Sequence, residues 1–140
     1  MNKTEIFAFI KKCGHAYMAT IEGNKPRVRA MGTHRADENG IVFAMQTYKD
    51  VYKQLVKNPD VELCYFADGV QVRIVGRLQG SKDLALKKEI LEARPFYKPG
   101  VEKEGWGYFE VYILKHGKAN FFDMKGPPAP PGTPKTWIDL

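Results

Sequence analysis

Only two cysteines occur in the chain, Cys13 and Cys64, and neither lies in a CxxC or other metal-binding spacing. Two cysteines cannot form the disulfide framework of a small secreted domain. The single serine, Ser81, lies outside any GxSxG elbow, and the three histidines form no HxxxH or HExxH pair. We therefore expect no metal and no serine nucleophile, and any difficult chemistry falls to a bound cofactor.

Long apolar runs are also absent, and none approaches the roughly 20 residues that span a bilayer. The N-terminal segment 1–14 has charges on both sides of a very short apolar stretch, so it lacks the extended apolar core of a signal peptide. These two absences predict a soluble protein of the cytoplasm with no membrane association.

The composition is typical of a globular protein, with 44% hydrophobic and 27% charged residues among 140. That length suffices for one domain with its own core. The 22 Lys and Arg residues exceed the 16 Asp and Glu residues, which gives a net charge of +6. This excess favours an anionic partner such as phosphate, a nucleotide, nucleic acid or a membrane surface, without choosing among them.

The hydrophobic periodicity predicts a mainly β chain with short helices. Helices are expected over residues 2–13, 48–57 and 81–93, the first with a capping box from Asn2 and Glu5 and a stop at Gly14. Strands are expected over residues 15–21, 27–35, 41–44, 61–66, 70–78, 105–114 and 118–124. The first strands are expected to form an antiparallel meander and the last two to pair with each other. Such a succession favours a small barrel over a doubly wound sheet.

Two arginines point to an anion site. Arg27 and Arg29 lie two positions apart, so on a strand both side chains face the same way. Neighbouring guanidinium groups repel each other unless an anion lies between them, and arginine binds phosphate through two parallel hydrogen bonds. The alternative is a solvated face of an edge strand.

Two further polar residues, Lys49 and Gln71, lie at positions where they can bind a ligand. Lys49 is expected in the first turn of a helix, where the free N–H groups and the positive end of the dipole attract anions. Gln71 is expected on a strand, and its amide can donate to and accept from a ring edge. An ordinary surface lysine and an ordinary strand glutamine are the alternatives.

The order of four segments is a stronger signal than any one of them. These are KPRVR at 25–29, DENGIVF at 37–43, KDVYKQLVKNPDVEL at 49–63 and VRIVG at 72–76. Together with the Pro-Lys-Thr sequence at 134–136, this succession resembles the pyridoxamine 5′-phosphate oxidase-like, FMN-binding split-barrel family, and more narrowly its small flavin-binding members. The segment 49–63 is the most specific part of the resemblance.

The resemblance implies a six-stranded antiparallel split β-barrel with short flanking helices. It also implies a homodimer with FMN in clefts at the subunit interface. Residues 1–125 would form the FMN-binding domain, and the proline-rich residues 126–140 would be a tail packed on the domain or on the dimer partner.

The resemblance also implies site residues. Those expected to contact FMN are Arg27, Arg29, Ala30, Met31, Gly32, Met45, Gln46, Thr47, Lys49, Gln71 and Trp106. In this scheme Arg29 and Lys49 bind the phosphate, residues 30–32 and 45–47 follow the ring and the ribityl chain, and Gln71 reaches the ring edge. Trp106 is a candidate to stack on the ring, with a core or interface anchor as the alternative.

The expected function is that of an FMN-dependent oxidoreductase acting on a small molecule, with a reduced nicotinamide as electron donor. Met45 stands where many relatives carry threonine, and the C-terminal substrate-phosphate ligands of the longer true oxidases are missing, which speaks against pyridoxamine phosphate oxidation. A non-enzymatic flavin-binding electron carrier or sensor is the alternative. A nucleic-acid-binding barrel is disfavoured, because acidic residues are interspersed throughout.

Overall fold

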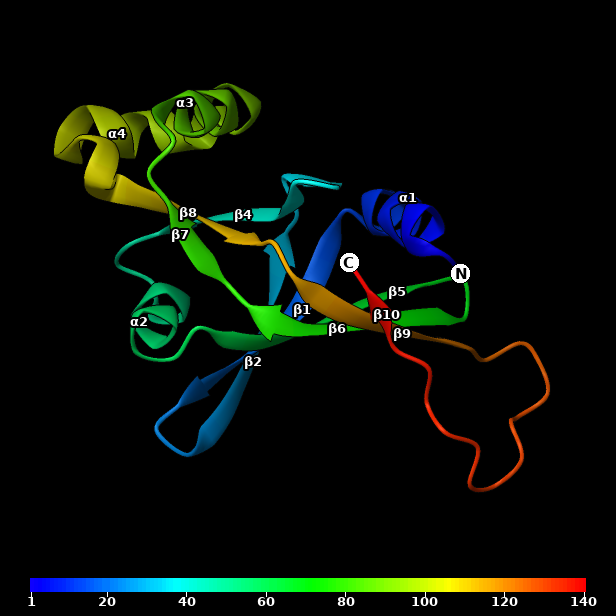
Figure 1. Cartoon of the computed structure of the whole chain (residues 1–140). Helices are drawn as coiled ribbons and strands as arrows, with labels where there is room; N and C mark the ends of the chain where they lie inside the picture. The colour runs from blue at the N-terminus through cyan, green and yellow to red at the C-terminus, as the bar shows by residue number, and fades with distance from the viewer.

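Ten strands form two antiparallel sheets in the computed structural model, which describes all 140 residues (Figure 1). The first sheet has the strand order β10 (Ile138–Asp139), β9 (Gly117–Asp123), β6 (Val70–Arg77), β5 (Asp60–Ala67), β1 (His15–Glu22) and β2 (Lys25–Gly32). The second has the order β3 (Arg35–Asp37), β4 (Gly40–Gln46), β8 (Phe109–Leu114) and β7 (Gln79–Ser81). The two sheets do not close into one cylinder, and the predicted mainly antiparallel split barrel is confirmed.

Four α-helices and two 3-10 turns flank the sheets. They are α1 (Lys3–Cys13), α2 (Asp50–Lys57), α3 (Leu84–Ala93), η1 (Pro95–Tyr97), α4 (Lys98–Glu104) and η2 (Trp106–Tyr108). Helix α1 has the predicted capping box and ends at Gly14 with a φ of 77°. Helix α4 was not predicted, because Pro99 and Gly100 are typical of a loop, although proline is tolerated in a first helical turn. None of the helices has the length and hydropathy of a membrane span.

The predicted pairing of the last two strands is wrong. Strand β8 pairs with β4 and β7, whereas β9 pairs with β6 and β10. The chain changes sheets between them, and the side chain of Leu114 fills the corner. A Cβ atom at Gly117 would lie 2.6 Å from Leu114 Cδ2, and one at Gly76 would lie 3.1 Å from Leu114 Cδ1. A Cβ atom at Gly76 would also lie 3.2 Å from the backbone oxygen of His116, which explains a glycine inside this strand.

The predicted meander of the first strands is also wrong, because they form two separate hairpins. The β1–β2 hairpin belongs to the six-stranded sheet, and the β3–β4 hairpin belongs to the other. Strand β4 is buried on both faces: Phe43 lies in the main core, and Val42 lies in a second core under α3. A strand with two buried faces needs packed side chains on both sides of its sheet. Strand β4 has them because it lies between β3 and β8 in the four-stranded sheet, with one core on each face.

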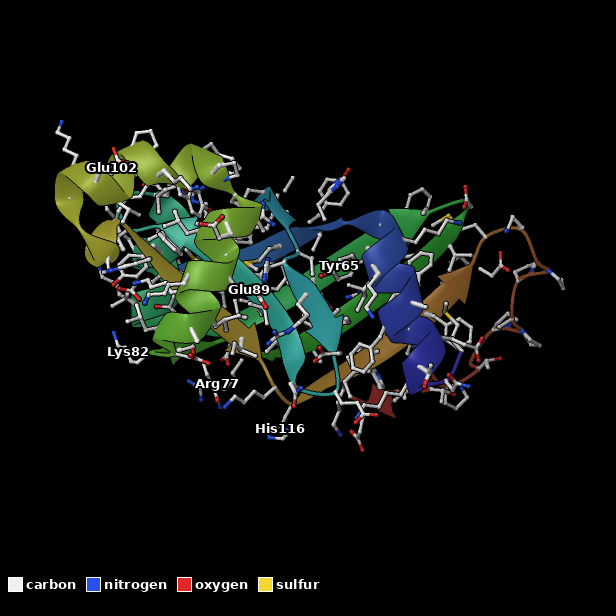
Figure 2. The ribbon with its side chains drawn as sticks, turned by 90° about the horizontal axis from the view of Figure 1, so that it is seen from above. Tyr65, Arg77, Lys82, Glu89, Glu102 and His116 are labelled. Carbon is white, nitrogen blue, oxygen red and sulfur yellow. The ribbon has the colours of Figure 1, made fainter.

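Two hydrophobic cores result, a main one of 20 residues and a second one of seven. The main core lies between the sheets and is covered by α1 and α2, whereas α3 and η1 cover the second. Seen from above, α1 and α3 lie on either side of the β3–β4 hairpin (Figure 2). This arrangement leaves the β1–β2 hairpin projecting beside α2, and the candidate site lies there (Figure 1).

Candidate functional site

The side chain of Arg29, which belongs to β2, is held by hydrogen bonds to β1 and α2. Its Nη1 atom donates to the backbone oxygen of Met18 at 3.1 Å and to Thr20 Oγ1 at 2.7 Å, and its Nη2 atom donates to Gln54 Oε1 at 2.6 Å. Thr20 is 2% exposed and Gln54 is 5% exposed, so these partners are themselves packed in the interior. The guanidinium group is therefore oriented before any ligand arrives.

The network behind Arg29 was missed by the sequence analysis. Thr20 Oγ1 donates to Gln54 Oε1 at 2.5 Å, and Gln54 Nε2 donates to Glu22 Oε2 at 3.3 Å. The available signal was the helical spacing of Gln54, which shares the buried face of α2 with Val51 and Leu55. A glutamine on such a face needs polar partners, because an unpaired buried amide is costly.

Arg29 forms no ion pair. Burial lowers the pKa of its guanidinium group, and the carboxylate of Asp50 at the start of α2 raises it. Asp50 and Gln54 are one helical turn apart, so Arg29 packs beside the first turn of this helix. A half-buried arginine that lacks a carboxylate partner has donors left for an anionic ligand.

Lys49 immediately precedes α2 as its N-cap residue, with an extended backbone and no side-chain hydrogen bond to the helix. Its ammonium group takes part in none of the ion pairs of the molecule. The N–H groups of the first turn therefore have no side-chain cap. Arg29 and Lys49 thus flank the same helix start, a donor set that suits a phosphate group.

Arg27 differs from Arg29, although both lie on the same face of β2. Its Nη2 atom contacts Glu22 Oε1 at 3.0 Å, and this hydrogen bond is the main cause that lowers the pKa of Glu22. Glu22 thus compensates the charge of Arg27. Farther along the strand, Met31 packs against the main core, whereas Ala30 and Gly32 are exposed.

The end of β4 meets the η2 turn. Thr47 Oγ1 donates to the backbone oxygen of Gly107 at 2.9 Å, and the Thr47 amide donates to the oxygen of Tyr108 at 3.0 Å. These bonds bring Trp106, which is 37% exposed, near Gln46 and Thr47. The side chain of Met45 is 1% exposed and lies in the main core, so only the backbone of this residue is available to a ligand.

Gln71 lies on the opposite face of the six-stranded sheet from Arg29. Its neighbour Val72 is fully buried, so Gln71 points outward, whereas Arg29 is paired with Met18 in the row that faces the core. One chain therefore does not bring Gln71 to the site beside α2.

A third cation without an ion pair, Arg94, lies near the end of β2 and was not predicted. It is the C-cap residue of α3, and a Cβ atom at Gly32 would lie 3.1 Å from its Nη2 atom. Burial raises the pKa of the nearby Tyr97, and the charge of Arg94 lowers it. The sequence carries no signal for this contact, because 61 residues separate Gly32 from Arg94 along the chain.

Comparison with known proteins identifies relatives of this architecture. A NimC/NimA family protein from Clostridium acetobutylicum has a TM-score of 0.77 at 27% identity, over 99% of this chain and 93% of that chain. General stress protein 26 from Bacillus anthracis has a TM-score of 0.71 at 14% identity, over 99% and 98% of the two chains. A pyridoxamine 5′-phosphate oxidase-related, FMN-binding protein from Nostoc punctiforme has a TM-score of 0.68 at 15% identity, over 99% and 95%.

No curated protein matches the chain. The family model described as pyridoxamine 5′-phosphate oxidase matches residues 3–103, which include both hairpins, α2, β5, β6 and α3. The match thus spans Lys49, Arg29 and the network that orients Arg29. The chain belongs to the pyridoxamine 5′-phosphate oxidase family.

Proposed function

We propose that the protein is an FMN-binding flavoprotein that acts as an oxidoreductase on a small molecule. The observation that carries the proposal is the guanidinium group of Arg29, which is oriented by Thr20 and Gln54 and has no carboxylate partner beside the start of α2. A phosphate group satisfies such donors well. The FMN-binding protein from Nostoc punctiforme, which has the same fold, supports this choice of ligand.

Different residues near the start of α2 and the end of β2 would bind the phosphate and the ring of FMN. Arg29 and Lys49 hold the phosphate, while the exposed edge of β2 at Ala30 and Gly32 lies along the ring. Trp106 stands at the end of β4, where it excludes water from one side. Arg94 places an unpaired cation beside Gly32, where it favours negative charge on the bound ring. When bound, FMN supplies the transfer of electrons to or from the substrate.

The test is the colour and the flavin content of the purified protein. We expect a yellow protein that releases FMN on denaturation, and a colourless protein that binds no added FMN would contradict the proposal. Steady oxidation of a reduced nicotinamide with a small acceptor would support the oxidoreductase. Reduction of the flavin without turnover would favour the electron carrier or sensor instead.

We also propose a homodimer that uses the outer face of the six-stranded sheet. This face carries the exposed apolar side chains of Tyr17, Val28 and Phe66, which are 49%, 69% and 49% exposed. Contiguous apolar surface of this kind is typical of an interface. Gln71 lies on the same face, so a partner subunit could supply it to a flavin that its own chain cannot reach.

Val28→Arg is expected to raise the dissociation constant of the dimer about 100-fold or more, because a two-fold interface would contain the buried charge twice. Analytical ultracentrifugation over a range of concentrations measures this change. Leu84→Arg is the matched control, since Leu84 is 47% exposed on α3, away from the face. A Val28→Arg protein that stays as dimeric as the control would rule out this interface.

A further inference from the structure

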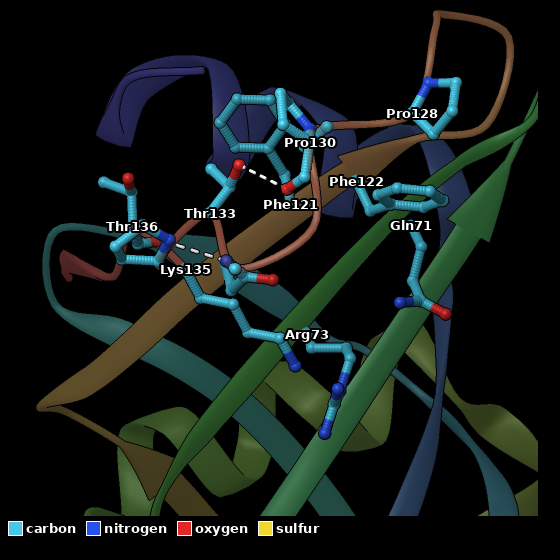
Figure 3. A pocket seen from close by; sticks show the side chains of 13 residues that line it. Gln71, Arg73, Phe121, Phe122, Pro128, Pro130, Thr133, Lys135 and Thr136 are labelled. Atoms are coloured by element: carbon cyan, nitrogen blue, oxygen red, sulfur yellow. Dashed lines mark hydrogen bonds between the residues drawn. The ribbon is translucent and has the colours of Figure 1, made fainter.

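A cavity of about 580 Å³ lies between the C-terminal tail and the outer face of β6 and β9 (Figure 3). Its floor is formed by Gln71, Arg73, Asn120, Phe121 and Phe122, and its roof is formed by tail residues between positions 128 and 136. The volume is within the range of small-molecule sites in proteins, roughly 300–1,000 Å³. Neither Arg29 nor Lys49 lines it.

The roof is held in place at several points. Asn120 Nδ2 donates to the backbone oxygen of Thr136 at 2.9 Å, and Thr133 Oγ1 donates to the oxygen of Pro130 at 2.6 Å. Beyond the roof, β10 pairs with β9, and the Leu140 amide donates to the oxygen of Gly117 at 2.9 Å. The prolines of the tail further restrict its backbone. The cavity is therefore formed before a ligand enters, which reduces the entropic cost of binding.

The charges in the cavity do not balance. Arg73 Nη2 contacts Glu62 Oε1 at 2.7 Å, whereas Lys135 forms no ion pair. Figure 3 shows the side chain of Lys135 extending from the tail toward Arg73. Two cations thus approach each other with a single carboxylate for compensation, so one positive charge is left for a ligand. A monoanion restores neutrality.

The remaining walls are flat and apolar. Phe122 is the cross-strand partner of Gln71, its ring is 47% exposed on this face, and Pro128 lies above it in the roof (Figure 3). Aromatic rings and prolines offer flat surfaces on which a planar ring packs well. The arrangement thus separates a cationic end at Lys135 and Arg73 from an apolar end at Phe122 and Pro128.

We propose that this cavity binds a small aromatic monocarboxylate. The carboxylate lies between the ammonium group of Lys135 and the free N–H groups of Arg73, and the aromatic ring lies against Phe122. This inference goes beyond the phosphate end of the flavin site, because it uses neither Arg29 nor Lys49. Gln71 lines this cavity and also lies on the face proposed for the dimer, so competition with FMN distinguishes the two sites.

Benzoate is the probe, and titration of the ¹⁵N-labelled full chain by NMR is the measurement. Saturable shifts are expected at the amides of residues 120–122 and of Thr133, Lys135 and Thr136. Benzamide, which has the same ring without the charge, is expected to bind about tenfold more weakly, and Lys135→Gln is expected to weaken benzoate about tenfold. Lys115→Gln is the matched control, because Lys115 is exposed, forms no ion pair and lies outside the cavity.

A second variant tests the arginine. Arg73→Lys keeps a cation beside Glu62 but loses the fork of donors, so we expect benzoate binding to weaken several-fold with an unchanged melting temperature. Equal affinity for benzoate and benzamide, or unchanged binding by Lys135→Gln, would overturn the proposal. Displacement of benzoate by FMN would also overturn it, because the cavity would then belong to the flavin site.

Discussion

Arg29→Ala is expected to raise the dissociation constant for FMN about 100-fold, because it removes a pair of charge-assisted hydrogen bonds to the phosphate. Riboflavin has the same ring system and no phosphate, so its affinity should change little. Fluorescence titration of both flavins against the wild type and the variant measures the difference. An equal loss for FMN and riboflavin would contradict the placement of the phosphate at Arg29.

The network around Arg29 determines which controls are needed. Without the guanidinium group, Thr20 and Gln54 still bond to each other at 2.5 Å, so the free energy of unfolding should fall by only about 1 to 2 kcal/mol. Arg77→Ala is the charge-matched control, since Arg77 is exposed and pairs with Asp60, which lies beyond the C-terminal end of α2 and not at its start. Lys49→Ala should weaken FMN binding in the same direction but less, because an exposed ammonium group contributes less than a positioned fork.

Gly40→Ala is expected to lower the free energy of unfolding by about 3 kcal/mol and the melting temperature by about 10 °C. Gly40 has a φ of 118°, which side chains rarely adopt, and its Cβ atom would lie 2.6 Å from Ile113 Cγ2 and 2.9 Å from the backbone oxygen of Leu114. Neither strain can be relieved without moving β8. Chemical and thermal denaturation followed by circular dichroism measure the change.

Gly23→Ala separates the two causes of this loss. Gly23 has a φ of 65°, and nothing lies within 4 Å of a Cβ atom there, so the variant carries the backbone strain without the clash. We expect it to cost about 1 kcal/mol. If Gly40→Ala proved no less stable than Gly23→Ala, the close contact between the β3–β4 turn and β8 would be wrong.

Local elements were predictable because their causes lie close together in the chain. The capping box of Asn2 and Glu5 starts α1, and Gly14 ends it. The hairpin that joins β3 to β4 turns at Asn39 and Gly40, and this dipeptide is itself a strong hairpin signal. Most strands were also recognisable, since alternating burial needs only neighbouring residues.

The partners of the strands were harder to predict from the sequence than the strands themselves. Only two residues separate β8 from β9, which is typical of a hairpin, yet these strands lie in different sheets. The chain changes sheets here because Leu114 packs against Gly76 and Gly117. The two residues that connect β8 to β9 carry no sequence signal for this packing. The same limit explains the short strands β7 and β10, whose partners are distant in the sequence.

The candidate site shows the same division. The sequence by itself determined the residue types and the order of segments, which were enough to predict the family and to select Arg29 and Lys49. Only the tertiary structure decided that Thr20 and Gln54 orient Arg29, that Arg94 reaches Gly32, and that Gln71 faces away. The physical reason is that periodicity and capping depend on neighbours a few residues apart, whereas a side chain's partners are set by the packing of whole elements against one another.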